Sequence, residues 1–273
     1  MGNWRATVID HRSKRGAQLR DRPKEPFARR DDLVISGRAG EITCADTAGR
    51  TRWTHPVPGS PNAAHISSGR VLVTTDSLDY HAWGHLGPAY LLDLADGTLT
   101  AELRGARGAA LGGGRFVLGL EGYGTFATWQ YDRDGTLTDT WRSYGHYVVG
   151  TGLRVVECDR NGPTESRVVR LLPGGVIERS PLLLTDSQVP RPLVLPDGTI
   201  VVLDAGVLRA VGRDLDDTVL AELRPIPVDE LHRHISTLHR TPDGLSVTIS
   251  ERHPTRMSTY TTHTWALALH PPQ

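Results

Sequence analysis

Three histidines lie near the start of short β-type runs that are spread along the chain. His65, His146 and His234 stand in the segments "AAHIS", "GHYVV" and "HRHIS". Three imidazoles that converge on one point would ligate a divalent transition metal and leave positions open for water or substrate. The bound metal would act as a Lewis acid or lower the pKa of its water. The pattern therefore predicts a three-histidine metal site.

The third histidine of this set has an alternative. In the alternative register, counted back from the apolar run that follows each histidine, His65 aligns with His239 instead of His234, and the repeated tripeptide His-Ile-Ser would be a coincidence. Polar side chains on inner strands also serve only to satisfy neighbouring backbone groups. Both interpretations stay open at the level of sequence.

Two loops carry further chemistry-bearing side chains. The segment "SLDYHAWGHLGP" (77 to 88) holds His81 and His85, whose spacing of four places them on one side of a helical turn. The segment "EGYGT" (121 to 125) holds Glu121 and Tyr123 between glycines. We predict these four as catalytic residues, with Glu121 or a loop histidine as general base or as support for a metal ligand.

Aromatic and basic side chains surround the same positions and predict substrate contacts. An aromatic loop over a channel suits a small organic molecule or peptide, although the same loop would also pack as a cap with no ligand. The residues predicted to contact substrate are Tyr80, Trp83, Tyr147, Arg191, His253 and Arg256.

These side chains are positioned by a repeated unit. The segments "ADGTLTAEL" (95 to 103) and "RDGTLTDTW" (133 to 141) are near copies, and related turns recur at a period of about 40 residues, the size of one four-stranded propeller blade. Helical periodicity is almost absent. The apolar runs predicted to be second strands lie at 33–36, 71–73, 116–118, 155–156, 200–203 and 245–247.

Six such units predict an all-β fold, a six-bladed β-propeller of four-stranded blades formed by residues 1–273 as a single domain. The last unit ends at "ALALHPPQ" without an outer strand, and "GNWRATVID" at the N-terminus resembles the outer strand "GRTRWTH". We therefore expect the N-terminal strand to complete the last blade, which removes an exposed sheet edge.

One unit resembles a known repeat family. "DLVISGRAGEITCADTAGRTRWTH" carries an apolar second strand ending at Gly37, a short loop closed by Gly40, a third strand ending at Asp46, a turn at Gly49 and Trp53 on the outer strand. This order closely resembles the repeat of PQQ-like (quinoprotein-type) β-propellers. The resemblance implies the fold. It does not imply pyrroloquinoline quinone, because the quinone enzymes of that family are longer, with eight blades and a cofactor-stacking tryptophan.

The composition of the chain limits the kinds of binding partner that we expect. The chain of 273 residues has 31 Lys and Arg, 31 Asp and Glu and two Cys. A net charge of +0 favours neither nucleic acid nor an anionic membrane, and no apolar run reaches the roughly 18 residues of a membrane span. Because the N-terminus lacks the apolar core of a signal peptide and the cysteines form no pattern, we expect a cytoplasmic protein. Its oligomeric state stays open.

Two functional hypotheses follow. The first is a small enzyme with a site at the channel mouth, acting as a lyase, isomerase or oxygenase on a small organic molecule or peptide. The abundance of Arg and Gly with few Lys resembles actinobacterial proteins, which suggests natural-product metabolism. The alternative is a non-catalytic propeller that binds or scaffolds a protein or peptide partner through exposed aromatic side chains.

Overall fold

The chain folds into six four-stranded antiparallel sheets, which confirms the predicted all-β blade pattern. The computed structural model describes residues 4–16, 27–75, 88–122, 125–150, 152–158, 166–184, 189–255 and 259–272. Within these residues, the one helical segment is the short 3-10 helix η1 (Val228–Arg233). No helix in this part of the chain is long and apolar enough to cross a membrane.

The chain divides into two compact units. The central unit comprises Arg22–Val155 and Arg170–Ile177, and the terminal unit comprises Met1–Asp21, Val156–Val169 and Glu178–Gln273. The sheet formed by β14, β15, β16 and β17 contributes residues to both.

Three complete sheets belong to the central unit, each with its strands in chain order. Their strands are β2 (Ala28–Arg30), β3 (Leu33–Arg38), β4 (Glu41–Asp46), β5 (Thr51–Pro56); β6 (Pro61–Ser67), β7 (Arg70–Thr75), β8 (Pro88–Asp93), β9 (Leu99–Arg104); and β10 (Arg107–Gly112), β11 (Arg115–Gly122), β12 (Thr125–Tyr131), β13 (Leu137–Trp141). The next sheet consists of β14 (Gly145–Gly150), β15 (Gly152–Glu157), β16 (Val168–Leu172) and β17 (Val176–Arg179).

The terminal unit holds two complete sheets. Their strands are β18 (Leu193–Val194), β19 (Ile200–Asp204), β20 (Val207–Val211), β21 (Asp217–Glu222); and β22 (His234–Thr241), β23 (Gly244–Arg252), β24 (Tyr260–His270) with β1 (Arg5–Gly16). The predicted second strands coincide with β3, β7, β11, β15, β19 and β23, because short apolar runs between Gly and Asp turns form strands. β7 and β19 are buried along almost their whole length, whereas β3 and β23 are buried at alternate residues or fewer.

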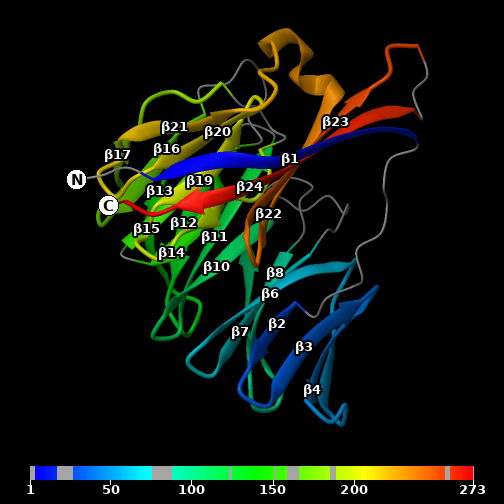
Figure 1. The fold of residues 1–273 in the computed structure, drawn as a ribbon. Helices are drawn as coiled ribbons and strands as arrows, with labels where there is room; N and C mark the ends of the chain where they lie inside the picture. Colours follow the sequence, from blue (N-terminus) through cyan, green and yellow to red (C-terminus); the bar gives the residue numbers. More distant parts are fainter. Residues whose placement is uncertain are drawn as a thin grey trace. The chain divides into compact units, whose positions relative to one another are not determined.

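The last sheet combines both ends of the chain, as predicted. β1 runs antiparallel to β24 from the pair Arg5 and His270 to the pair Gly16 and Tyr260, with a bulge between Val8 and Asp10. Figure 1 shows the blue N-terminal strand beside the red C-terminal one. The sheet order β1-β24-β23-β22 therefore gives the C-terminal strands the outer strand that their own segment lacks.

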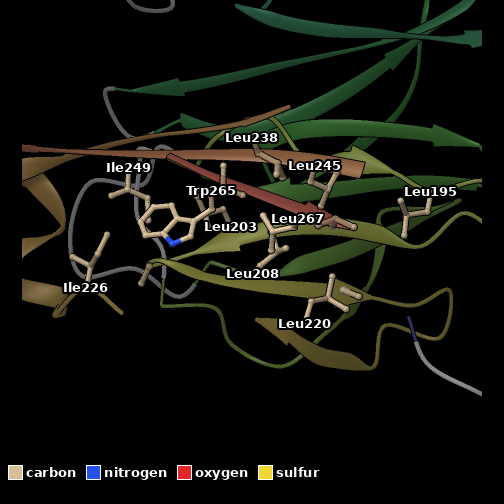
Figure 2. Close-up of a cluster of buried hydrophobic side chains, with 14 of the residues drawn as sticks. Leu195, Leu203, Leu208, Leu220, Ile226, Leu238, Leu245, Ile249, Trp265 and Leu267 are labelled. Atoms are coloured by element: carbon tan, nitrogen blue, oxygen red, sulfur yellow. The ribbon is translucent and has the colours of Figure 1, made fainter. Parts of the chain in front are cut away.

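An apolar layer fills the space between the two sheets of the terminal unit. It includes Leu203 and Leu208 from one sheet and Ile249, Trp265 and Leu267 from the other, all at most 5% exposed. Figure 2 shows these side chains interdigitating. Removal of this apolar area from water, worth roughly 25 cal/mol per Å², holds the two sheets together.

In two sheets, a tryptophan on the outer strand packs against the sheet that follows it in the chain. Trp53 of β5 is 7% exposed, and its Nε1 donates to the carbonyl oxygen of Leu94 at 2.9 Å. Its ring lies against Gly97 in the turn after β8, where a Cβ would come within 2.7 Å of the indole. Trp141 of β13 likewise donates to the carbonyl of Leu172 at 2.6 Å. The Trp53 that marks the PQQ-like unit is thus an inter-sheet contact.

This contact predicts unequal effects of two similar substitutions. Gly49 and Gly97 occupy equivalent turns with φ of +83° and +74°, but only at Gly97 would a Cβ meet a neighbour within 4 Å. Gly49→Ala should cost about 1–2 kcal/mol of unfolding free energy from the left-handed backbone. Gly97→Ala should cost roughly 1–3 kcal/mol more, because the methyl group displaces Trp53. Urea unfolding measures both, and equal losses would contradict the docking role of Trp53.

Candidate functional site

The predicted metal-binding histidines are divided between the two units. His65 lies in β6 and His146 in β14 of the central unit, whereas His234 is the first residue of β22 in the terminal unit. His234 is 5% exposed. Within the described residues, no group of three or more His, Cys, Asp and Glu side chains is placed to hold a metal ion. The three-histidine metal site stays a prediction.

Strand pairing decides which histidines occupy equivalent positions. His65 lies two residues before Ser67, the last paired residue of β6. His239 lies two residues before Thr241, the last paired residue of β22. His65 therefore corresponds to His239, and His234 lies five residues earlier. The repeated His-Ile-Ser does not mark equivalent positions, which favours the alternative register.

Several predicted site residues lie outside the residues that the structure describes. They are Tyr80, His81, Trp83, His85, Tyr123 and Arg256. Of the predicted catalytic set, Glu121 is described: it lies in β11, opposite Phe126 of β12, and is half-buried.

The remaining predicted substrate contacts have varied surroundings. The hydroxyl of Tyr147 lies 2.8 Å from Oγ1 of Thr128 and so helps to join β14 to β12. Arg191 is exposed, just before β18. The Nδ1 of His253 accepts a hydrogen bond from the backbone N–H of Thr255 at 3.2 Å, which directs this ring to its own turn. The roles predicted for these residues stay predictions.

A cluster of charged and imidazole side chains forms where the apolar layer of the terminal unit ends. His234 opens β22 directly after η1, and its Nδ1 lies 2.9 Å from the carbonyl oxygen of Glu230. A carbonyl oxygen only accepts, so Nδ1 carries the proton in this bond. In the neutral form of the ring this leaves Nε2 unprotonated, and Nε2 lies 4.0 Å from Oε2 of Glu251.

Two arginines hold the carboxylate of Glu251. Arg224, which follows β21, donates from Nη2 to Oε2 at 2.6 Å. Arg233, the last residue of η1, places Nη2 3.7 Å from Oε1. The side chains of Glu251, Arg224 and Arg233 are 25%, 40% and 27% exposed, so this edge of the cluster reaches solvent while His234 lies beneath it.

The charges of the cluster set its electrostatics. Burial acts to raise the pKa of Glu251, but the hydrogen bond and charge of Arg224, with smaller contributions from His234 and Arg233, leave that pKa lowered overall. Glu251 is therefore an ionised partner of the arginines and a weak base. With two guanidinium groups and one carboxylate, the cluster has excess positive charge.

A stack of aromatic rings borders this cluster. The rings of His11 and Trp265, paired across β1 and β24, lie 4.7 Å apart at 10°, and His263 stacks on His11 with centroids 5.5 Å apart. Nε2 of His11 and Nδ1 of His263 are 3.3 Å apart. Burial, and then the charges of Arg224 and His11, lower the pKa of His263, against the opposite effect of Glu251.

This arrangement combines a fixed imidazole lone pair with guanidinium donors, which suits proton abstraction and stabilisation of the resulting negative charge. Of its members, the sequence singled out only His234, as a metal ligand. Arg224, Arg233 and His263 were missed because the pairing of β22 with β23 and the path of η1, not a local motif, bring them together. The apolar residues Ile226 and Ile249, two positions from Arg224 and Glu251, lie at the same end of the core in Figure 2.

Comparison with known proteins shows which solved structures have a similar fold. No family model matches the chain, and no curated protein matches it. Among solved structures, the chain is similar to streptogramin B lyase with 13% identity over 96% of this chain and 99% of that one, at a TM-score of 0.52. It is similar to a catalytically inactive virginiamycin B lyase from Staphylococcus aureus with quinupristin, with 12% identity, coverage of 95% and 99% and a TM-score of 0.53.

A weaker similarity connects the chain to BamB from Moraxella catarrhalis, with 15% identity, coverage of 85% and 79% and a TM-score of 0.44. At these identities the comparisons show the fold alone. Together with the six four-stranded sheets, the similarity to the two lyase structures defines the protein as a β-propeller with six blades.

The metal hypothesis is checked by elemental analysis of the purified protein. A site formed by His65, His146 and a histidine of β22 should retain about one divalent transition-metal ion per chain. His146→Ala should then lose the metal, whereas His232→Ala, an exposed control in η1, should keep it. Metal-free protein that takes up no added zinc would refute the hypothesis.

The lowered pKa of His263 predicts a loss of stability in mild acid. Because the unfolded chain takes up this proton near the usual pKa of 6.5 and the folded chain at lower pH, the stabilising contribution is present above pH 6.5 and lost as pH falls. The thermal midpoint of the wild type should fall more between pH 7.5 and 5.5 than that of His263→Gln. Equal falls in the two proteins would show that His263 is not the group responsible.

Proposed function

We propose that the protein is a lyase that acts on a small peptide-like molecule through His234. The observation that carries the proposal is the fixed orientation of this ring: Nδ1 donates to the Glu230 carbonyl at 2.9 Å, and Nε2 points toward Glu251 at 4.0 Å beside two arginines. A base held in one tautomer beside cationic donors is suited to removing a proton from carbon.

In the proposed reaction, Nε2 of His234 takes a proton from the carbon next to a substrate carbonyl. The electron pair of the broken C–H bond forms a carbon–carbon double bond and expels a leaving group from the adjacent carbon. Guanidinium N–H groups of Arg224 and Arg233 stabilise the negative charge that develops on the carbonyl oxygen. The proton on the imidazolium then passes to the leaving group, which balances the reaction.

The choice between base and metal ligand rests on local charge. A histidine that donates Nδ1–H to a carbonyl is also oriented for metal binding through Nε2. The excess positive charge from Arg224 and Arg233 beside Glu251 disfavours a divalent cation at this position and favours an anionic intermediate. We therefore assign His234 the role of general base in this proposal.

The reaction and substrate classes draw support from the structural neighbours. Streptogramin B lyase is a lyase by name, and the virginiamycin B lyase structure was determined with quinupristin. Both are similar to this chain over at least 95% of its length. Quinupristin is therefore the first probe for the proposed activity.

The test is incubation of purified protein with quinupristin, followed by liquid chromatography with mass and ultraviolet detection of a new double bond. Wild type should convert the compound, and His234→Gln should be slowed by about 100-fold or more, the usual contribution of a general base. His232→Gln, which changes an exposed histidine two residues away, should retain activity. EDTA should leave conversion unchanged, since the base is the side chain.

The other outcomes discriminate between hypotheses. Quinupristin that binds to wild type without conversion would favour a binding module. Conversion by His234→Gln at the wild-type rate would remove His234 from the mechanism. Absence of both binding and conversion would overturn the proposed substrate class.

A further inference from the structure

A groove in the central unit has no part in the proposed function. It lies between the sheets β10–β13 and β14–β17 and has a volume of about 530 Å³. Packing imperfections between sheets hold at most a few waters, each of about 30 Å³ in the liquid. A groove of this size instead falls in the range of small-molecule sites, roughly 300–1,000 Å³.

The lining of the groove combines polar side chains with a group of apolar ones. Leu111, Val149, Leu153 and Leu171 line it from strands of both sheets, and Trp141 contributes an indole. The hydrogen bond from Trp141 Nε1 to the Leu172 carbonyl fixes that ring, so the wall is preformed. Such a surface favours the apolar body of an organic molecule over water.

Most polar groups of the groove are already engaged. The carboxylate of Asp139 accepts hydrogen bonds from the backbone N–H groups of Gly174 at 2.8 Å and Gly175 at 3.1 Å, which joins β13 to the turn before β17. The side-chain amide of Gln130 donates to Oγ1 of Thr138 at 3.0 Å. These bonds shape the groove and hold the Asp139 carboxylate toward the turn before β17.

Arg115 is the exception among the lining residues. It is exposed at the start of β11, and it forms no ion pair or side-chain hydrogen bond with the described residues. Its guanidinium group is therefore open to a ligand that lies in the groove. A guanidinium binds carboxylate and sulfonate groups through paired N–H donors.

We infer that this groove is a binding site for a small organic anion with an aromatic or alicyclic body. The apolar part of the ligand lies against Trp141, Leu153 and Leu171, and its acidic group pairs with Arg115. The site is independent of the His234 cluster, because all of its lining residues belong to the central unit.

The inference is tested with two related fluorescent probes, 8-anilinonaphthalene-1-sulfonate and N-phenyl-1-naphthylamine, which share an apolar body and differ in the anionic group. Wild type should bind both, and the sulfonate more tightly. Arg115→Gln should weaken the sulfonate about fivefold and leave the neutral probe unchanged, as expected for loss of one solvent-accessible ion pair. Arg29→Gln, which changes an exposed arginine of β2, is the matched control.

A second variant tests the location. Val149→Trp places a large side chain in the groove at a position that is 40% exposed, so the fold should tolerate it, and both probes should then bind at least tenfold more weakly. Circular dichroism confirms that each variant is folded. The inference is overturned if Val149→Trp binds the probes as wild type does, if Arg115→Gln keeps the preference for the sulfonate, or if wild type binds neither probe.

Discussion

The indole of an outer-strand tryptophan, docked on the next sheet, is the contact on which the blade arrangement of the central unit depends. Trp53 and Trp141 each bury a large apolar ring and donate Nε1–H to a backbone carbonyl of the following sheet. A buried indole N–H or carbonyl left unpaired would cost about 1–3 kcal/mol, so the bond fixes where each sheet meets its neighbour. Burial of the apolar rings stabilises the packing of the sheets, and this hydrogen bond determines where one sheet lies on the next.

In the terminal unit, too, apolar side chains hold the sheets together and polar side chains make specific contacts at the edge. The layer that contains Leu203, Ile249 and Trp265 presses its two sheets together, and charged side chains gather where that layer ends. Glu251 continues the inward-facing side of β23 one step beyond Ile249, and it meets Arg224 as well as His234. The candidate site therefore forms because side chains alternate along β23, so that the residue after the last apolar one on the inward face is the charged Glu251.

The comparisons illustrate how little a propeller fold restricts chemistry. Proteins with 12% or 13% identity share the fold over nearly the whole chain, which requires only apolar strands, tight turns and inter-sheet contacts in the right order. Function depends on side chains at strand ends and in connections, where the fold tolerates almost any residue. For this reason the proposed activity rests on His234 and its neighbours, and the similarity to lyases serves as support.

The six sheets, their second strands and the closure of the last sheet by β1 could all be predicted from the sequence. These features follow from local patterns: apolar runs, Gly and Asp turns, and a missing outer strand. The strand pairing and the packing of the sheets were needed to show that His65 corresponds to His239 and that Arg224 and His234 both lie against Glu251. Apolar periodicity is a local property that can be recognised along the chain. The ion pair between Arg224 and Glu251, which are 27 positions apart, forms only after two sheets have packed together and the segment between them has folded.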